Sequence, residues 1–531
     1  MTMVDGARGD LEFGTIPGLL ELAAMRHGER TAVEDRLTAL TYRGLAAAVK
    51  RAARALLARG IARRDRVAVW APNRWEWIVA ALATHTVGGV LVPLNTRFKG
   101  AEAAWILGQS EARVLFTVRE FLGQDYLAML EGESLPALQT RVLFDGDDAR
   151  AATWGAFLAG SHRVSEKEVE ARQASVEPDD LADLLFTSGT TGKPKGVMCT
   201  HAQTLRAFRD WSEIAGLRAG DRYLVVPPFF HSFGYKAGWL ASLMMGATVL
   251  PQATFDVRAV LARIERDRVT VLPGPPTLYQ SILAALDQGD APALGSLRLA
   301  VTGAAVVPVD LVRRMQRDIG FETVLTAYGL TEATGVSTMC RQDDEPETIA
   351  TTSGRAIPGV GLRVVNDGGV DAGVGKPGEV LVSGYAVTKG YWGDDEKTAQ
   401  AIDAEGWLHT GDVGTLDARG NLTITDRLKD MFIVGGFNAY PAEIEQALGR
   451  HERIAEVAVV GAPDERLGEV GMAFVVAKPG CIVDEAEIVA WSRERMANYK
   501  VPRRVAVVSA LPRNASGKVL KNELRARATQ K

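Results

Sequence analysis

The sequence has few cysteines and no surplus of positive charge. Its 531 residues include three cysteines, Cys199, Cys340 and Cys481, which lie far apart and lack the spacing of metal ligands. This pattern excludes a disulfide framework and a zinc site. The formal net charge of -4 excludes an extended basic surface for nucleic acid or anionic lipid. We therefore expect no nucleic acid among its partners.

Long apolar runs are also missing. An apolar stretch such as WIVAALATHTVGGVLVPL, residues 77–94, is interrupted by His85, two glycines and Pro93, and is therefore a poor membrane span. The first residues, MTMVDGARGDLEFG, include acidic side chains and no apolar core, unlike a secretory signal. We expect a cytoplasmic protein without integral membrane association.

Length and hydrophobic patterning indicate an α/β protein with more than one domain. A chain of 531 residues is too long for one compact core. From about residue 40 to residue 330, helix-period stretches alternate with short apolar strands, as in RWEWIVAALATHTVGG followed by VLVPLN. This alternation is typical of parallel sheets covered by helices.

The pattern changes after about residue 350, where shorter strands and tight turns predict a β-barrel-like subdomain. A further boundary is expected near residues 427–430, followed by a helix that Pro441 opens and by strands such as EVAVVGAPD. We expect a large N-terminal domain over residues 1–426, a hinge at 427–430, and a small α+β C-terminal domain over residues 431–531.

The stretch FTSGTTGKPKGV, residues 186–197, combines three glycines, four hydroxyls and two lysines directly after an apolar strand. Main-chain N–H groups in such a turn converge on an anion, so a phosphate ligand is expected. The stretch is not a Walker A loop, because Thr187 replaces the first glycine and Pro194 follows Lys193, where Ser or Thr should bind magnesium. A flexible linker is the alternative interpretation.

A second glycine pattern, GVGKPG at residues 373–378, fits the dinucleotide fingerprint GxGxxG. A strand-like segment, GEVLVSG, follows it, whereas a dinucleotide site requires a helix at this point. The pattern therefore predicts a turn.

The phosphate loop resembles the signature loop of the adenylate-forming enzymes, which include the acyl-CoA synthetases, the adenylation domains of peptide synthetases and firefly luciferase. Further blocks follow in the family's order, namely TGAA (302–305), AYGLTE (327–332), GWLHTGD (406–412), DRLKDMFIVGGFNAYPAEIE (426–445) and NASGK (514–518). The resemblance covers nearly the whole chain. It implies that a carboxylic acid attacks the α-phosphate of ATP, which releases pyrophosphate and leaves an acyl-adenylate.

The resemblance implies ATP, Mg²⁺ and coenzyme A as cofactors or co-substrates. The residues expected to bind them are Thr187, Ser188, Gly189, Thr190, Thr191, Gly192, Lys195, Gly303, Ala304, Ala305, Ala327, Tyr328, Gly329, Asp412, Arg427, Gly435, Gly436 and Asn438. By resemblance, the loop residues would hold the phosphates and Tyr328 would face the adenine. Asp412 and Arg427 would contact the ribose side, and Gly435 and Gly436 would line the CoA tunnel. Glu332 and Thr190 would hold Mg²⁺, which prefers oxygen ligands.

The catalytic residues expected by resemblance are Lys518, Glu332, Thr331 and His231. Lys518 would bridge the acid and the α-phosphate, where a fixed cation stabilises developing charge. Without the resemblance, a lysine so near a chain end would be regarded as solvated. Lys429 corresponds to the hinge about which the C-terminal domain swings. His231 would position the acid, with a core histidine as an equal alternative.

The residues expected to contact the acid are Phe230, His231, Gly234, Tyr235, Lys236 and Gly329. Helical spacing places Lys236 on one face with Trp239, Leu240 and Leu243. A lysine on an apolar face needs a partner. It either meets a polar group at the far end of a ring-bearing keto acid, or it pairs with a nearby carboxylate or extends to the surface.

Thioester formation with CoA is the expected fate of the adenylate. The segments PPFFHSFGYKAG, VLPGPPTLYQS and VLTAYGLTEA are most similar to one branch of the family, the bacterial ligases that act on the methylindane-dione propanoate left from steroid rings C and D during cholesterol breakdown. A medium- or long-chain fatty-acid-CoA ligase is the enzymatic alternative, and a nucleotide-binding scaffold is the non-enzymatic one. The expected partners are a small carboxylic acid, ATP and CoA, with a homodimer left open.

Overall fold

The computed structural model describes residues 8–187, 194–289, 292–303, 307–427, 430–434, 437–464, 466–496, 498–514 and 518–529. The side chains of residues 426, 427, 437 and 438 are outside this description. The chain divides into two compact units. The first comprises residues 1–303, 307–361 and 382–408, and the second comprises residues 304–306, 362–381 and 409–531.

The first unit contains a seven-stranded sheet that carries the phosphate loop. Its strand order is β11-β10-β4-β3-β5-β8-β9, and only β10 and β11 run antiparallel to one another. The strands are β3 (Arg66–Trp70), β4 (Val90–Pro93), β5 (Val114–Thr117), β8 (Thr140–Leu143), β9 (Ala152–Thr153), β10 (Leu181–Thr187) and β11 (Lys195–Thr200). The predicted parallel sheet is therefore present, with an antiparallel hairpin at its edge.

Of the other described strands of this unit, β6 (Glu120–Phe121) and β7 (Gln124–Asp125) form a two-stranded sheet, and the rest form two four-stranded sheets. These are β12 (Arg222–Val225), β13 (Thr248–Pro251), β1 (Thr31–Asp35) and β2 (Thr38–Thr41), and β14 (Leu299–Gly303), β15 (Thr323–Tyr328), β16 (Thr338–Met339) and β17 (Arg355–Ala356). Val271 forms isolated bridges to Tyr223 and to Leu299. Within the segment VTVLPGPP, residues 269–276, Val271 therefore bridges the two sheets without being part of a longer strand.

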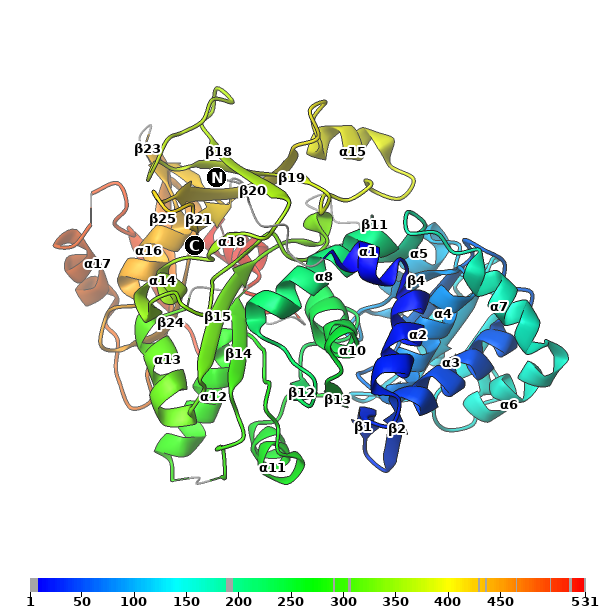
Figure 1. Cartoon of the computed structure of the whole chain (residues 1–531). Coiled ribbons are helices and arrows are strands. Elements are labelled where there is room, and N and C mark those ends of the chain that lie inside the picture. Colours follow the sequence, from blue (N-terminus) through cyan, green and yellow to red (C-terminus); the bar gives the residue numbers. More distant parts are fainter. Residues whose placement is uncertain are drawn as a thin grey trace. The chain divides into compact units, whose positions relative to one another are not determined.

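Helices cover these sheets, and their ends follow local sequence signals. The main ones are α2 (Ile16–His27), α3 (Tyr42–Leu57), α4 (Trp75–Thr86), α5 (Gly100–Gln109), α7 (Glu166–Ala174), α8 (His201–Ala215), α11 (Val257–Asp267) and α12 (Pro276–Asp287). The Thr41 hydroxyl accepts a hydrogen bond from the Gly44 N–H and caps α3, while α8 begins with a capping box and ends at the left-handed Gly216. Helices α3 and α4 lie side by side (Figure 1), and α4 packs against strands β3 and β4 of the seven-stranded sheet.

The second unit is built mainly on antiparallel strands, with one parallel pair, β25–β26. One sheet has the order β18-β19-β20-β21, formed by β18 (Val360–Val365), β19 (Gly378–Gly384), β20 (Leu408–Leu416) and β21 (Leu422–Arg427). Another contains β22 (Phe432–Val434), β23 (Phe437–Ala439), β24 (Ile454–Asp464), β25 (Gly468–Ala477) and β26 (Arg504–Val507), with helices α16 (Pro441–Leu448), α17 (Glu485–Arg493) and α18 (Lys521–Thr529). The predicted turn at residues 373–378 leads directly into β19.

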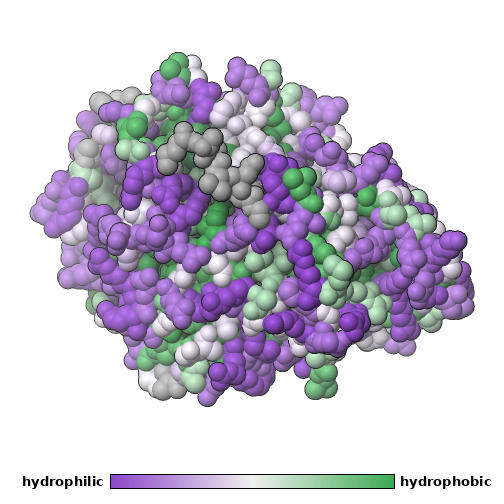
Figure 2. Space-filling model, in the orientation of Figure 1, coloured by the Kyte–Doolittle hydropathy of each residue, from purple (hydrophilic) through white to green (hydrophobic). Residues whose placement is uncertain are grey.

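These elements confirm the predicted fold class, with helix-covered sheets first and antiparallel sheets after residue 360. The second compact unit includes residues 362–381 and 409–427 together with the C-terminal elements. The boundary between the two units therefore differs from the predicted hinge at 427–430. That hinge concerns movement and stays a prediction. No described helix is long and apolar enough to cross a membrane. The face seen in Figure 2 carries mostly hydrophilic residues, with apolar residues in small separate groups.

Candidate active site

The hairpin β10–β11 presents the ends of the glycine-rich loop. Thr187 and Lys195 are paired residues of the two strands, so they close the loop between them. Because the chain returns as an antiparallel strand, this is not the strand-to-helix turn of a Walker site. Predicted residues Ser188, Gly189, Thr190, Thr191 and Gly192 lie outside the described residues.

Glu332 lies beside this hairpin, in the short 3-10 turn η5 (Thr331–Ala333). The Thr187 hydroxyl is 3.5 Å from Glu332 Oε1, and the Tyr391 hydroxyl donates a hydrogen bond to the same oxygen at 3.1 Å. The Lys195 ammonium lies 4.7 Å from the centre of the Tyr391 ring. Burial, together with the Glu332 charge, raises the pKa of Tyr391, so its hydroxyl keeps its proton and acts as a donor.

This donor set fits a magnesium ion bound together with a nucleotide. Glu332 supplies a carboxylate and Thr187 a hydroxyl, and both are hard oxygen ligands. Among the described residues, no three His, Cys, Asp or Glu side chains form a metal cluster. A cation here would therefore take most of its ligands from phosphates and water, which is the usual arrangement for Mg²⁺.

Tyr328 stands at the end of β15, immediately before the turn that carries Thr331 and Glu332. Gly329 is needed there, because a Cβ at this position would lie 2.4 Å from the Gly335 carbonyl oxygen. The predicted residues Gly303 and Ala327 are partners in the parallel pair β14–β15, so the structure brings these two motifs together. Ala304 and Ala305 lie outside the described residues.

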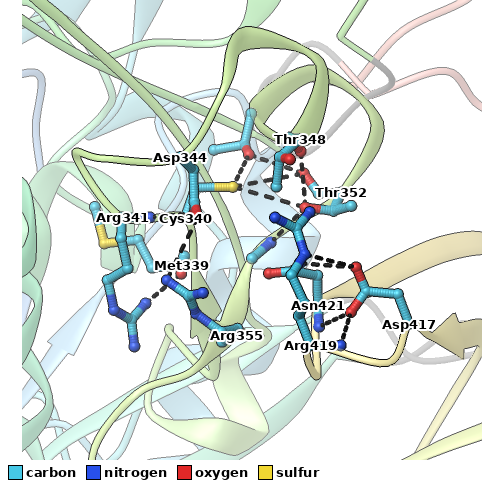
Figure 3. A network of polar contacts seen from close by, with 12 residues as sticks. Met339, Cys340, Arg341, Asp344, Thr348, Thr352, Arg355, Asp417, Arg419 and Asn421 are labelled. Atoms are coloured by element: carbon cyan, nitrogen blue, oxygen red, sulfur yellow. Dashed lines mark hydrogen bonds and ion pairs between the residues drawn. The ribbon is translucent and has the colours of Figure 1, made fainter.

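Polar contacts fix the strands around this turn. The Thr326 hydroxyl lies 3.0 Å from the Cys340 sulfur and donates to the Ile349 carbonyl oxygen at 2.8 Å. Figure 3 shows the Cys340 thiol beside Thr352, whose hydroxyl donates to the Thr348 carbonyl oxygen at 2.8 Å. This buried network anchors β15 and β16 (Thr338–Met339), between which the Tyr328–Glu332 segment turns.

The predicted acid-binding segment begins at His231, which caps the short helix α9 (Ser232–Gly234). His231 Nδ1 accepts a hydrogen bond from the Phe233 N–H at 3.2 Å. Gly234 packs against the main chain, since a Cβ there would lie 2.2 Å from the Pro228 carbonyl oxygen. The His231 side chain is exposed and Phe230 is partly exposed, so both are available to a ligand.

Lys236 has a buried carboxylate partner. The segment Tyr235–Leu240 is π-helical, so α-helical spacing does not describe its faces. Lys236 Nζ lies 3.1 Å from Asp183 Oδ1, and both side chains have 0% exposure. Burial is the largest single influence and lowers the pKa of Lys236, but the charges and hydrogen bonds of Asp183 and Cys199 together outweigh it, and the net shift is upward. The structure therefore favours the alternative of a lysine paired with a carboxylate over a contact with the far end of the acid.

Tyr235 belongs to the same buried polar cluster. Its hydroxyl lies 3.0 Å from His85 Nε2, and the His85 ring is 5.4 Å from the His201 ring. All three side chains are fully buried. Tyr235 therefore contributes to the packing between α4, α8 and the π-helical segment, and its predicted role as an acid-binding residue stays a prediction.

In the second unit, the hairpin β20–β21 brings two predicted residues together. Asp412 and Arg427 are paired residues of the two strands, as expected for two groups that serve the same side of a nucleotide. Asp412 is buried, with 4% exposure. At the turn of the hairpin, Asp417 accepts a hydrogen bond from Asn421 Nδ2 at 2.8 Å (Figure 3), which fixes the strands in this register.

Lys518 lies on an exposed turn before α18. Its N–H donates to Asn514 Oδ1 at 2.9 Å, and its carbonyl oxygen accepts from the Asn514 N–H at 2.8 Å. These two bonds join Asn514 and Lys518 directly, while residues 515–517 lie outside the described residues. The predicted residues Lys429, Gly435 and Gly436, and the side chains of Arg427 and Asn438, lie outside the described residues.

A pocket of about 950 Å³ in the second unit was not predicted. Four arginines line it, namely Arg466, Arg493, Arg503 and Arg504. Arg503 donates to Asn498 Oδ1 at 2.9 Å, and Arg504 donates to the Pro463 carbonyl oxygen at 3.2 Å. These bonds hold two guanidinium groups at the pocket and leave donors for an anionic ligand. No sequence pattern predicts this pocket, because the four arginines are scattered over 39 positions, from 466 to 504.

Two family models that together match most of the chain identify an enzyme of the adenylate-forming class. The AMP-binding enzyme family model matches residues 20–392, and the AMP-binding enzyme C-terminal domain model matches residues 443–518. The chain therefore belongs to the AMP-binding enzyme family.

Two relatives carry the name 3-[(3aS,4S,7aS)-7a-methyl-1,5-dioxo-octahydro-1H-inden-4-yl]propanoyl:CoA ligase, one from Rhodococcus jostii and one from Mycobacterium tuberculosis. Each is 52% identical over 520 residues, which is 96% of this chain and 98% of the relative. A solved structure of the anthranilate CoA ligase AuaEII with anthranoyl-AMP matches with a TM-score of 0.85 and 28% identity, over 98% of both chains. These findings confirm the predicted class, an AMP-forming acyl-CoA ligase.

Proposed function

We propose that the chain uses ATP to join a ring-bearing propanoate from steroid breakdown to coenzyme A. The acid would be the methyl-dioxo-octahydroindenyl propanoate named for the two relatives. The observation that carries the proposal is their identity to this chain, which extends over nearly its whole length. The acid-binding segments that resembled this branch belong to the matched region. We also propose a cytoplasmic location, where ATP and CoA are available, with a homodimer as an open option.

The reaction would proceed in two steps. In the first, a carboxylate oxygen of the acid attacks the α-phosphorus of ATP, and the bond to pyrophosphate breaks. Thr187 and Lys195 would hold the β- and γ-phosphates from the two ends of the loop. Lys518 would contact the acid and the α-phosphate, where a positioned cation is typically worth about 10²–10³ in rate. In the second step, the CoA sulfur attacks the acyl carbon and AMP leaves.

Glu332 and Thr190 are the residues that we propose for holding Mg²⁺. When bound, the cation would neutralise charge on the phosphates. Glu332 suits this role because its carboxylate lies beside Thr187 at the loop and is held by Tyr391. Asp412 and Arg427, paired across their hairpin, would take the ribose hydroxyls and the adjoining phosphate.

The arginine pocket would hold the nucleotide end of CoA. CoA carries a 3′-phosphate and a diphosphate, and guanidinium groups are well matched to phosphate oxygens. Arg503 and Arg504 stand at this pocket, each fixed by a hydrogen bond to the main chain or to Asn498. We expect Arg503→Ala to raise the KM for CoA while leaving the KM for 3′-dephospho-CoA nearly unchanged. An equal rise for both thiols would contradict this assignment.

An acid panel tests the proposed substrate. Pyrophosphate release and thioester formation would be measured with the indane-dione propanoate, a medium-chain and a long-chain fatty acid, each with CoA added or omitted. We expect the highest kcat/KM with the indane-dione propanoate and acid-dependent pyrophosphate release. Preference for fatty acids would support the fatty-acid-CoA ligase, and no turnover with any acid would support the scaffold.

A further inference from the structure

The chain segment 388–392 links the phosphate-loop hairpin to the turn that carries Glu332. The Thr388 N–H donates to the Glu332 carbonyl oxygen at 2.8 Å, and the Thr388 hydroxyl donates to the Met198 carbonyl oxygen at 2.7 Å. Met198 belongs to β11, which follows the loop. Segment 388–392 is therefore hydrogen-bonded both to the turn that carries Glu332 and to strand β11 of the phosphate-loop hairpin.

Within this segment, the Tyr391 side chain contacts two residues of the proposed ATP site, Glu332 and Lys195. It is 7% exposed, and its hydroxyl donates to Glu332 Oε1 at 3.1 Å. Its ring lies under the Lys195 ammonium, 4.7 Å from the ring centre. A single phenol thus contacts the carboxylate proposed for the metal and the lysine proposed for the phosphates.

We infer that Tyr391 is a positioning residue, which orients the Glu332 carboxylate for Mg²⁺ through its hydroxyl and holds Lys195 at the phosphates through its ring. This inference rests on the proposed function. A carboxylate that binds a metal is usually fixed by a hydrogen bond from a neighbouring group, and loss of that group typically lowers metal affinity by about 10- to 100-fold. An aromatic face attracts an ammonium group by a cation–π interaction that does not require the hydroxyl.

A purely structural role is the competing interpretation. Tyr391 also packs with Val197 and Cys199 in a small buried cluster, so its loss would lower stability whatever its function. The two roles differ in what they change. A structural role predicts lower stability alone, whereas the positioning role predicts a specific change in the requirement for Mg²⁺.

The chain offers a matched control for the hydroxyl. Tyr385 is partly buried, and its hydroxyl donates to the Asp210 carboxylate at 3.1 Å, the same distance as between Tyr391 and Glu332. Asp210 is not part of the site. Tyr391→Phe and Tyr385→Phe therefore remove equivalent bonds, of which only the first involves a proposed metal ligand.

The experiment measures ATP binding by calorimetry, without any acid, at a series of Mg²⁺ concentrations and in EDTA. We expect Tyr391→Phe to raise the Mg²⁺ concentration for half-maximal ATP binding by about five- to tenfold, with metal-free ATP binding within about twofold of wild type. Tyr391→Leu should also weaken metal-free ATP binding, by about threefold, because Lys195 loses the ring. Tyr385→Phe should leave both quantities unchanged, with a comparable loss of thermal stability.

Several results would overturn the inference. These are an unchanged Mg²⁺ requirement in Tyr391→Phe, an equal loss of metal-free and Mg²⁺-dependent binding, or the same shift in Tyr385→Phe. Because no acid is present, the experiment is independent of the proposed substrate. A wild-type chain that binds ATP with Mg²⁺ but turns over none of the acids would contradict the proposed ligase function and leave this inference intact. A chain that binds no ATP would overturn both proposals.

Discussion

The ion pair between Lys236 and Asp183 gives a prediction that separates a structural role from a role in acid recognition. Both side chains have 0% exposure, and their charged atoms are 3.1 Å apart. Asp183 belongs to β10, where it pairs with Leu91 of β4 and Cys199 of β11. The pair therefore lies inside the sheet that ends in the phosphate loop. The substitution Lys236→Met removes the charge and keeps most of the volume.

The magnitude follows from the burial of the remaining partner. Removing one member of a buried ion pair leaves the other charge without compensation and typically costs about 3–5 kcal/mol, whereas replacing both members is often close to neutral. We expect Lys236→Met to lower the free energy of unfolding by about 3–5 kcal/mol. The double variant Asp183→Asn/Lys236→Met should recover most of this loss.

The assay is urea unfolding followed by tryptophan fluorescence, because Trp77 and Trp239 pack 6.0 Å apart beside this cluster. Lys50→Met is the matched control. Lys50 is partly exposed and pairs with Glu170 at 2.8 Å, so its loss should cost no more than about 1 kcal/mol. The activities of folded Lys236→Met toward the indane-dione propanoate and a medium-chain fatty acid should fall by similar factors.

Two results would refute this reasoning. One is a Lys236→Met variant as stable as the Lys50→Met control. The other is a selective loss of activity toward the indane-dione propanoate, with fatty-acid activity retained. The second result would restore the interpretation, drawn from the sequence, that Lys236 recognises the far end of a keto acid.

Three further predictions concern catalysis, domain movement and pH. Lys518→Ala should slow adenylate formation by about 10²–10³ and leave thioester formation from supplied acyl-adenylate largely intact, and equal losses in both half-reactions would contradict this role. Lys429→Pro fixes φ near about −65° and should impair the two half-reactions to very different extents, which separate assays of each step would measure. Burial lowers the pKa of His201 to about 4. Between about pH 6.5 and pH 4 the His201 ring is therefore protonated in the unfolded chain but not in the folded one. The free energy of unfolding should fall over this window by up to about 3 kcal/mol. His201→Asn should reduce this fall, as measured by urea unfolding at pH 7 and pH 4.5. The Asn side chain does not titrate, and its amide oxygen can accept the hydrogen bond from the Ile16 N–H that His201 Nδ1 accepts at 3.3 Å. An unreduced fall would assign the acid sensitivity to other groups.

The sequence predicted the alternating helices and strands because their hydrophobic periods are strong and local. For example, RVAVW forms β3 and PAEIEQAL forms α16. It also predicted that Thr187 and Glu332 serve one site, because both belong to motifs that occur in the order typical of the adenylate-forming family. The contact between them spans 145 positions, a distance over which no local pattern carries information.

The residues that sequence reasoning missed act through partners far along the chain. Tyr391 has no periodic or motif signal, and its partner Glu332 lies 59 positions away. Lys236 was recognised as anomalous, but its partner was not identified. One signal was present, since Asp183 interrupts the apolar strand LADLLFT, and an isolated carboxylate in a buried strand needs a cation. The π-helical segment from Tyr235 to Leu240 altered the side-chain spacing on which the interpretation of Lys236 depended.

The link made by residues 388–392 has a consequence for how the protein is synthesised. Domains fold progressively as the chain leaves the ribosome, yet the phosphate loop emerges about 200 residues before the segment that pairs with its strand β11, as residues 187 and 391 show. Until that segment arrives, the edge of β11 has no partner there and the Glu332 carboxylate is not held. We therefore expect nascent chains to acquire ATP affinity only after residue 392 has emerged. Arrested chains that end before residue 388 and after residue 400 would differ sharply in nucleotide retention, and the shorter ones would expose an unpaired strand edge to neighbouring chains.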